Sequence, residues 1–149
     1  MITLHEGDLL RSGCGVICHQ VNVQGVMGGG LAAAIAEKYP DCEAAYKKYI
    51  DNIKVPGLLL NSVYWHKLES GQYIANCFSQ KANFRTEYKA VKAVFENVRG
   101  TAETLGLTVG IPFGFGCGIA TGVWDKVFEI IQEVFADSKV DCQIWRLKG

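Results

Sequence analysis

The sequence has no excess of charge of either sign, few prolines and no long apolar segment. Its 149 residues include 15 Lys plus Arg, 15 Asp plus Glu and only three prolines. Proteins that bind nucleic acid through its phosphates usually carry a basic excess, so we expect no nucleic-acid partner. No run approaches the roughly 20 apolar residues of a membrane helix, so we expect no membrane partner. With 49% hydrophobic and 20% charged residues, the composition excludes a disordered chain.

Paired cysteine motifs and a secretion signal are also missing. None of the six cysteines belongs to a Cys-x-x-Cys pair, and no histidine follows at zinc-finger spacing. We therefore expect free, mostly buried thiols, with one nucleophilic cysteine as the alternative, and neither a metal nor a cofactor. The first residues lack the basic flank and apolar core of a signal peptide, which predicts a cytoplasmic location.

Short apolar segments alternate with helical patterns along the chain. Strands are predicted at 3–4, 16–21, 57–65, 72–78, 107–111 and 143–147. Helices are predicted at 27–38 and at 41–49, where Asp41 would be the cap. Thr86 and Thr121 would cap two more helices, whose apolar stripes run over 88–98 and 124–135. This alternation predicts an α/β fold with a largely parallel sheet flanked by helices, and ligands bind beyond the carboxyl ends of such strands.

The first glycine-rich loop, residues 22–30, lies between an apolar strand and an alanine-rich helix. Four of the six residues from Gly25 to Gly30 are glycine, although glycine costs about 0.5–1 kcal/mol against alanine in regular structure. Backbone without Cβ atoms can approach a ligand closely, and its N–H groups can hold a phosphate at the start of the helix. A tight turn with close helix packing is the alternative. The spacing matches neither a Rossmann dinucleotide motif nor a P-loop.

The second glycine-rich loop, residues 112–122, again follows a strand and precedes a helix. Its glycines stand at 114, 116, 118 and 122. Two such loops in one small domain could hold a diphosphate from both sides. Phe113 and Phe115 could border a sugar or a base, and Trp145 is a third candidate to cover an adenine ring.

Three segments, Gly7–Leu9, Cys18–Ala32 and Ile111–Ile119, resemble the signature segments of the macrodomain family in order and spacing. The short glycine loop is similar to that of the branch containing the terminal ADP-ribose protein glycohydrolase and the yeast ADP-ribose-1″-phosphate phosphatase. The resemblance implies one three-layer α/β macrodomain over residues 1–149. Its six-stranded sheet would be mixed, mostly parallel and flanked by helices. We expect a monomer.

The resemblance also implies that ADP-ribose or a derivative lies in the crevice, with an ADP-ribosylated protein as a further partner. Asp8 would accept a hydrogen bond from the adenine amino group, the Leu9 N–H would lie beside the ring, and Asn22 would bind the distal ribose. Both glycine loops would hold the ribose and the diphosphate. The ligand-binding positions implied in this way are Asp8, Leu9, Gln20, Asn22, Gly28, Gly29, Gly30, Leu31, Gly114, Phe115, Gly116, Cys117, Gly118 and Ile119.

The catalytic residues of the branch are matched only in part. The lysine and the aspartate of its protein glycohydrolase fall on Gln80 and Ala120, and Lys81 is predicted to point to the other face. The phosphatase has a histidine three residues before the loop asparagine, and His19 has this spacing from Asn22. A histidine with a pKa near 6.5 could exchange protons at neutral pH, with a satisfied core histidine as the alternative.

These residues are consistent with two functions. In the first, the chain hydrolyses ADP-ribose-1″-phosphate or an ADP-ribosyl ester at C1″, with His19 as the catalytic residue. In the second, it binds ADP-ribose or a related signalling nucleotide without catalysis. The missing lysine favours the binding module over a protein glycohydrolase, while His19 favours the hydrolase.

Overall fold

A mixed six-stranded sheet forms the middle layer of the computed structural model, which describes residues 1–27, 29–81, 85–118 and 120–148. The strand order is β1-β6-β5-β2-β4-β3, and β3 pairs with β4 antiparallel while the other neighbours are parallel. The strands are β1 (Ile2–Glu6), β2 (Val16–Val21), β3 (Val63–Lys67), β4 (Tyr73–Phe78), β5 (Val109–Pro112) and β6 (Cys142–Arg146). The predicted α/β architecture is confirmed.

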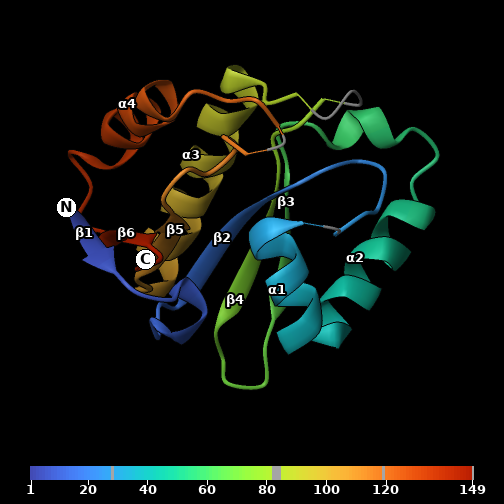
Figure 1. Ribbon diagram of the computed structural model, residues 1–149, viewed down its shortest axis with the longest axis horizontal. Coiled ribbons are helices and arrows are strands. Elements are labelled where there is room, and N and C mark those ends of the chain that lie inside the picture. The colour runs from blue at the N-terminus through green and yellow to red at the C-terminus, as the bar shows by residue number, and fades with distance from the viewer. Residues whose placement is uncertain (28, 82–84, 119, 149) are drawn as a thin grey trace.

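Helices cover both faces of the sheet (Figure 1). One face carries α1 (Gly30–Lys38) and α2 (Pro40–Asp51), and the other carries α3 (Tyr88–Leu105) and α4 (Trp124–Phe135). Two short 3₁₀ helices, η1 (Leu9–Arg11) and η2 (Pro56–Leu59), lie in connecting segments. The chain passes from the carboxyl end of β2 to the start of α1, and residues from both line a cleft at this end of the sheet.

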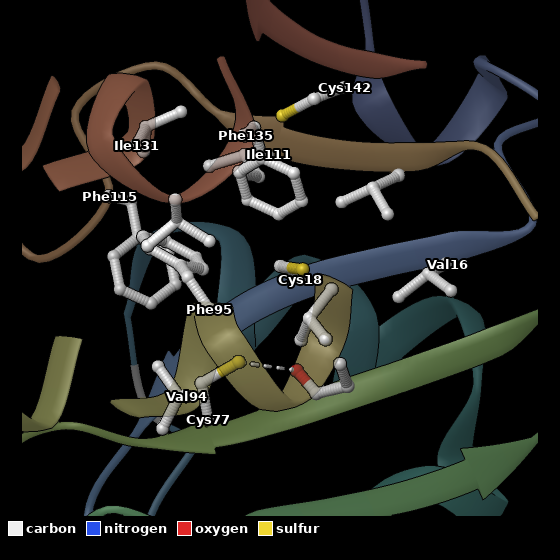
Figure 2. Packing of buried hydrophobic residues seen from close by; sticks show 14 of the residues in the cluster. Val16, Cys18, Cys77, Val94, Phe95, Ile111, Phe115, Ile131, Phe135 and Cys142 are labelled. Atoms are coloured by element: carbon white, nitrogen blue, oxygen red, sulfur yellow. Dashed lines mark hydrogen bonds between the residues drawn. The ribbon is translucent and has the colours of Figure 1, made fainter. Parts of the chain in front are cut away.

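The core is divided by the sheet into two apolar clusters. Figure 2 shows the cluster beneath α3 and α4, to which Val16 and Cys18 of β2 and Phe95 of α3 belong. Ile17 belongs to the second cluster, beneath α1 and α2. Because successive side chains of a strand point to opposite faces, this alternation places His19 on the α1 side of β2 and the next residue on the α3 side.

The first two helices begin at positions different from the predicted ones. The first helix was expected from Met27, but α1 begins at Gly30 with Gly29 as its N-cap. The prediction is wrong because the loop continues up to Gly29, which has an extended backbone with φ −148° and ψ 160°. Asp41 lies in the first turn of α2 and is not its cap, because Pro40 occupies the first helical position, where proline is preferred.

Neither predicted threonine cap is confirmed, and one predicted strand is shorter than expected. Glu87 caps α3 by accepting a hydrogen bond from the Lys89 N–H at 3.4 Å. The N-cap residue of α4 is Val123. Thr121 lies two residues earlier in the loop, where its φ of +64° is left-handed. Residues 57–60 were expected in a strand, but η2 covers most of them and β3 begins only at Val63.

The cysteines are free thiols, as predicted. Five of them are buried, and Cys117 is half-buried. Burial raises the pKa of the Cys14, Cys42 and Cys117 thiols, which lowers the thiolate fraction at neutral pH and disfavours a nucleophilic role. None of the helices in the described ranges is long and apolar enough to cross a membrane.

Gly110 of β5 provides a test of the core packing. A Cβ atom there would lie 2.5 Å from Leu9 Cδ1 and 3.1 Å from the Cys14 sulfur. We expect Gly110→Ala to lower the free energy of unfolding by about 1–3 kcal/mol, because overpacking forces neighbours to shift. Gly100→Ala in α3, whose Cβ meets nothing within 4 Å, should instead raise it by about 0.5–1 kcal/mol. Urea unfolding of both variants measures the two changes, and equal shifts would contradict this packing.

Candidate functional site

A cleft of about 550 Å³ opens at the carboxyl ends of β2, β4 and β5. The start of α1 and the loop after β5 both contribute residues to its lining. It is lined by His19, Gln20, Asn22, Val26, Gly29, Gly30, Leu31, Ala32, Gln80, Pro112, Phe113, Gly114, Phe115, Gly116, Gly118 and Ala120. Ligands of parallel α/β sheets bind at such a position.

The lining carries no formal charge at neutral pH. Among the described residues it includes no Lys, Arg, Asp or Glu. Most of its polar groups are backbone amides and uncharged carboxamides. An anion in this cleft would therefore be held by N–H dipoles rather than by side-chain cations.

Asn22 fixes the shape of the first loop. Its Oδ1 accepts hydrogen bonds from the N–H groups of Gln24 at 3.1 Å and Val26 at 3.3 Å, and its Nδ2 donates to the Val26 carbonyl at 2.9 Å. The Tyr46 hydroxyl donates to the Asn22 carbonyl from α2, and burial raises the pKa of Tyr46, so the hydroxyl keeps its proton. A direct role of Asn22 toward a ribose stays a prediction, because its side chain is already occupied by the loop.

The start of α1 directs unpaired amides at the cleft. Gly30, Leu31 and Ala32 line the cleft, and their N–H groups have no partner within a helix that begins at Gly30. The N-cap residue is Gly29, which has no side chain that could accept a hydrogen bond from these N–H groups. Gly30 has a φ of +54°, which a residue with a Cβ atom rarely adopts.

The second loop supplies a matching set of amides. Gly114, Gly116 and Gly118 line the cleft, and their N–H groups donate to no acceptor within the described residues. The N–H groups of the two residues between them donate inside the loop, at 3.1 and 2.8 Å. Gly114 and Gly116 have φ values of +80° and +73°, a left-handed backbone that glycine adopts without steric strain.

The second loop is held closed at the Gly116 carbonyl. This oxygen accepts hydrogen bonds from the Thr86 hydroxyl at 2.6 Å and from the Gly122 N–H at 2.9 Å. A Cβ atom on Gly122 would overlap it. The Thr86 N–H donates in turn to the Ala120 carbonyl at 2.9 Å. The hydroxyl and the backbone N–H of Thr86 therefore tie the loop to the segment before α3.

His19 is 1% exposed and lines the cleft. The Asn76 Nδ2 donates to the Tyr64 carbonyl at 2.9 Å, so the Asn76 oxygen accepts from the imidazole Nε2–H at 2.7 Å. Nδ1 then carries a lone pair, and it has no partner in the described part of the chain. Burial lowers the pKa of His19 to about 4, with the Asn76 bond opposing the shift. The expected titration near pH 6.5 is therefore wrong, and the imidazole is neutral at pH 7.

A second polar group at the cleft involves two glutamines. Gln20 Nε2 donates to the Ser79 hydroxyl at 2.9 Å and to the Thr86 hydroxyl oxygen at 3.3 Å. Gln20 Oε1 accepts from Gln80 Nε2 at 3.0 Å. Sequence reasoning named Gln80 only as a replaced lysine, since no local signal indicates a contact between residues 60 positions apart.

Lys81 was predicted to point to the other face. Its ammonium pairs with the Glu87 carboxylate at 2.9 Å, and this contact holds the pKa of Glu87 below its usual range.

The cleft brings together most of the implied binding positions. Those that line it are Gln20, Asn22, Gly29, Gly30, Leu31, Gly114, Phe115, Gly116 and Gly118, together with His19. Gly28 and Ile119 lie outside the described residues.

The other three positions, Asp8, Leu9 and Cys117, do not line the cleft. Asp8 is exposed and accepts a hydrogen bond from the Leu10 N–H at 2.9 Å, Leu9 is buried in the core, and the Cys117 thiol donates to the Phe115 carbonyl at 3.3 Å. The adenine contacts of Asp8 and Leu9 stay predictions.

The three aromatic candidates differ in their surroundings. Phe113 is 42% exposed and lines the cleft, and the Arg146 guanidinium lies 4.8 Å from the centre of its ring. Phe115 is buried, and Trp145 stacks on His5 with 4.9 Å between ring centres. Phe113 thus presents an exposed ring at the cleft, and a contact of any of the three with a base stays a prediction.

Comparisons with known proteins find relatives by sequence and by structure. No family model matches the chain. The DNA ADP-ribosyl glycohydrolase of Mycobacterium tuberculosis (strain ATCC 25618 / H37Rv) is 34% identical over 89 residues, which are 60% of this chain and 25% of the relative. The chain thus spans about a quarter of the length of the curated relatives it matches.

Solved structures match over nearly the whole chain. The macrodomain of Mycobacterium tuberculosis DarG superposes with a TM-score of 0.86 at 24% identity, covering 97% of both chains. Thermosipho africanus DarTG, solved in complex with ADP-ribose, superposes with a TM-score of 0.82 at 19% identity, covering 97% of this chain and 41% of that chain.

The state of His19 gives a pH-dependent prediction. Its pKa is about 4 when folded and about 6.5 when unfolded, so the unfolded chain binds more protons between these values. The histidine should therefore lower the free energy of unfolding by up to about 3 kcal/mol as the pH falls from 6.5 to 4. The difference between the pH profiles of the wild type and His19→Phe isolates this contribution. Nitrogen NMR at pH 7 should show the neutral Nε2–H tautomer, and an imidazolium at pH 6.5 would contradict the prediction.

Proposed function

The chain has a macrodomain fold, and from this premise we propose that its cleft binds ADP-ribose. The observation that carries the proposal is the pair of unpaired amide sets, at the start of α1 and at Gly114, Gly116 and Gly118, which line one uncharged cleft. A diphosphate between them would be bound from two sides by N–H groups and by the positive end of a helix. A volume of about 550 Å³ is in the range of nucleotide-sized ligand sites.

We further propose hydrolysis of an ADP-ribose derivative at C1″. The neutral Nδ1 of His19 can accept a hydrogen bond from a water molecule and so orient its oxygen toward C1″. The new C1″–O bond forms from that water, the bond to the leaving group breaks, and the proton of the water passes to the leaving group. Fixing both reactants in this way can supply much of a rate enhancement without a charged base.

The leaving group is proposed at the level of chemical class. ADP-ribose-1″-phosphate and an ADP-ribosyl ester on a protein are candidate substrates. The curated relative is named a DNA ADP-ribosyl glycohydrolase, which adds ADP-ribosylated DNA as a candidate. The balanced charge argues against general binding to nucleic acid, but it does not conflict with recognition of one modified nucleotide.

Specific observations favour binding without catalysis as the second candidate. Gln80 and Ala120 line the cleft where the resemblance places a lysine and an aspartate, and neither side chain can act as a base. His19 is neutral and a weak base, since its pKa is about 4. The binding proposal is common to both candidates.

We also propose that the protein works in the cytoplasm. Six free thiols, five of them buried, suit a reducing compartment. In an oxidising compartment a small domain would more often use its cysteines in disulfides.

Gly116 tests the binding proposal. Alanine there would strain a backbone with a φ of +73° and place a Cβ 3.1 Å from the Gln20 and Thr86 side chains. We expect Gly116→Ala to weaken ADP-ribose binding by about tenfold or more, as measured by calorimetry, which corresponds to about 1.4 kcal/mol. Gly71→Ala is the matched control, because it has a φ of +93° but lies in the turn between β3 and β4. Equal losses in both variants, or none, would argue against this loop as the ligand site.

The hydrolase proposal predicts turnover that depends on His19. The wild type should release ADP-ribose from ADP-ribosylated DNA or protein, or phosphate from ADP-ribose-1″-phosphate. His19→Phe should reduce kcat by about a hundredfold, because the water would no longer be oriented toward C1″. Product chromatography measures the release, with Gly71→Ala as the unaffected control. Binding of ADP-ribose without turnover of any of these substrates would contradict the hydrolase proposal and support binding without catalysis.

A further inference from the structure

Asn76 of β4 lies next to His19 but outside the cleft. The two residues are partners in the parallel register of β2 and β4, and only His19 belongs to the cleft lining. Asn76 is 0% exposed. Burying a carboxamide is costly unless its donors and acceptors are paired, so the contacts of Asn76 decide which way its side chain points.

Only one orientation of the Asn76 carboxamide suits both of its neighbours. Its Nδ2 donates to the Tyr64 carbonyl at 2.9 Å, and its Oδ1 lies 2.7 Å from His19 Nε2. In the reverse orientation, two oxygen atoms would face each other at Tyr64 without a proton between them. Oδ1 therefore accepts from Nε2–H, and the single proton of the neutral imidazole stays on Nε2.

The Tyr64 carbonyl that fixes this orientation is itself held in place. Tyr64 pairs with Asn76 in the antiparallel register of β3 and β4, so the ladder sets the direction of its backbone. Its ring stacks on Tyr49 of α2, with 4.3 Å between the ring centres. The donor and acceptor roles of the His19 ring are thus set by strand backbone two contacts away.

Titratable groups that face Asn76 and His19 are neutral at pH 7. Burial raises the pKa of the Cys42 thiol, which interacts with Asn76, to about 11, and it also raises the pKa of the Tyr64 hydroxyl. The described part of the cleft lining includes no Lys, Arg, Asp or Glu. The place of the His19 proton therefore follows from the hydrogen bond to Asn76 and not from a neighbouring charge.

We propose that Asn76 is a positioning residue for the hydrolysis and directs the Nδ1 lone pair of His19 at the attacking water. This inference rests on the proposed function, and the bonds formed and broken are those given there. With the proton held on Nε2, Nδ1 accepts a hydrogen bond from the water and leaves a lone pair of its oxygen free to bond to C1″. With the proton on Nδ1, the ring would donate to that oxygen and occupy the lone pair.

Asn76→Leu keeps the approximate size of the side chain and removes the acceptor of Nε2–H. The proton should then exchange between the two ring nitrogens, and kcat should fall about tenfold because the ring loses its fixed proton and its fixed orientation. KM should change by less than about twofold, since Asn76 does not line the cleft. Nitrogen NMR at pH 7 reads the tautomer, and initial rates on the candidate substrates give kcat and KM.

Asn76→Asp restores an acceptor and adds a charge, so it gives a second readout and decides the question if Asn76→Leu does not fold. At about pH 8 the carboxylate should hold the Nε2–H tautomer, and kcat should lie within about threefold of the wild type. A neighbouring carboxylate raises the pKa of a histidine. As the pH falls to about 6, this variant should lose at least about threefold in kcat relative to the wild type, because an imidazolium has no lone pair. The pKa of His19 in the wild type is about 4, so its ring stays neutral over this range.

Ile74→Val is the matched control for packing. Ile74 is a buried residue two positions before Asn76, so its side chain lies on the same face of β4. Its substitution loosens the same apolar cluster without touching the hydrogen bond of His19. It should leave the tautomer and kcat unchanged.

The outcomes separate the two proposals. If Asn76→Leu keeps the Nε2–H tautomer, or if Ile74→Val lowers kcat as much as Asn76→Leu does, the positioning role is wrong while the proposed function stands. A pH profile of Asn76→Asp that runs parallel to the wild type would contradict the role in the same way. If the wild type binds ADP-ribose but turns over none of the candidate substrates, the proposed hydrolysis fails and the role of Asn76 fails with it.

Discussion

The carbonyl oxygen of Gly116 accepts two hydrogen bonds, and the shape of the cleft depends on them. The Thr86 hydroxyl and the Gly122 N–H converge on this one atom, at 2.6 and 2.9 Å. Their convergence ties the loop after β5 to the segment before α3, and it also sets the donor and acceptor roles of Gln20 and Gln80. One backbone oxygen thus links the amides proposed for the diphosphate to the side chains of Gln20 and Gln80. A glycine is needed at 122 because a Cβ atom would occupy the position of that oxygen.

An uncharged cleft is a consistent solution for a ligand that combines a diphosphate with two sugars. Lysines would attract the phosphates, but they would also need a hydrated or paired ammonium group beside an apolar core. Backbone amides need neither, because the start of α1 and the glycines of the loop after β5 present them in fixed positions. The neutral state of His19 is consistent with this uncharged lining. Burial lowers its pKa to about 4, so the imidazole adds an acceptor without adding charge.

Much of the fold and of the site could be predicted because their signals are local. Strand periodicity located β2 and β4 nearly to the residue, and two clusters of glycines at strand ends located the loops that line the cleft. The failures share a different physical cause. Thr86 has the sequence of a helix cap, but its hydroxyl is used by a carbonyl 30 residues away. Likewise, the pKa of His19 depends on burial beneath α1, and Gln80 acquires its role from Gln20 on a neighbouring strand. Interactions between distant segments leave no mark in the local sequence.

The replacement of a lysine by Gln80 changes what the cleft can do chemically. A lysine at this position could donate to Gln20 Oε1 as the glutamine does, but it would leave no acceptor and would add a charge beside buried His19. The next residue does not restore that charge to the cleft, because Lys81 is held outside it by Glu87. Covalent chemistry through an amine is therefore not available to the described lining, and any reaction there must rely on positioned water and on fixed dipoles.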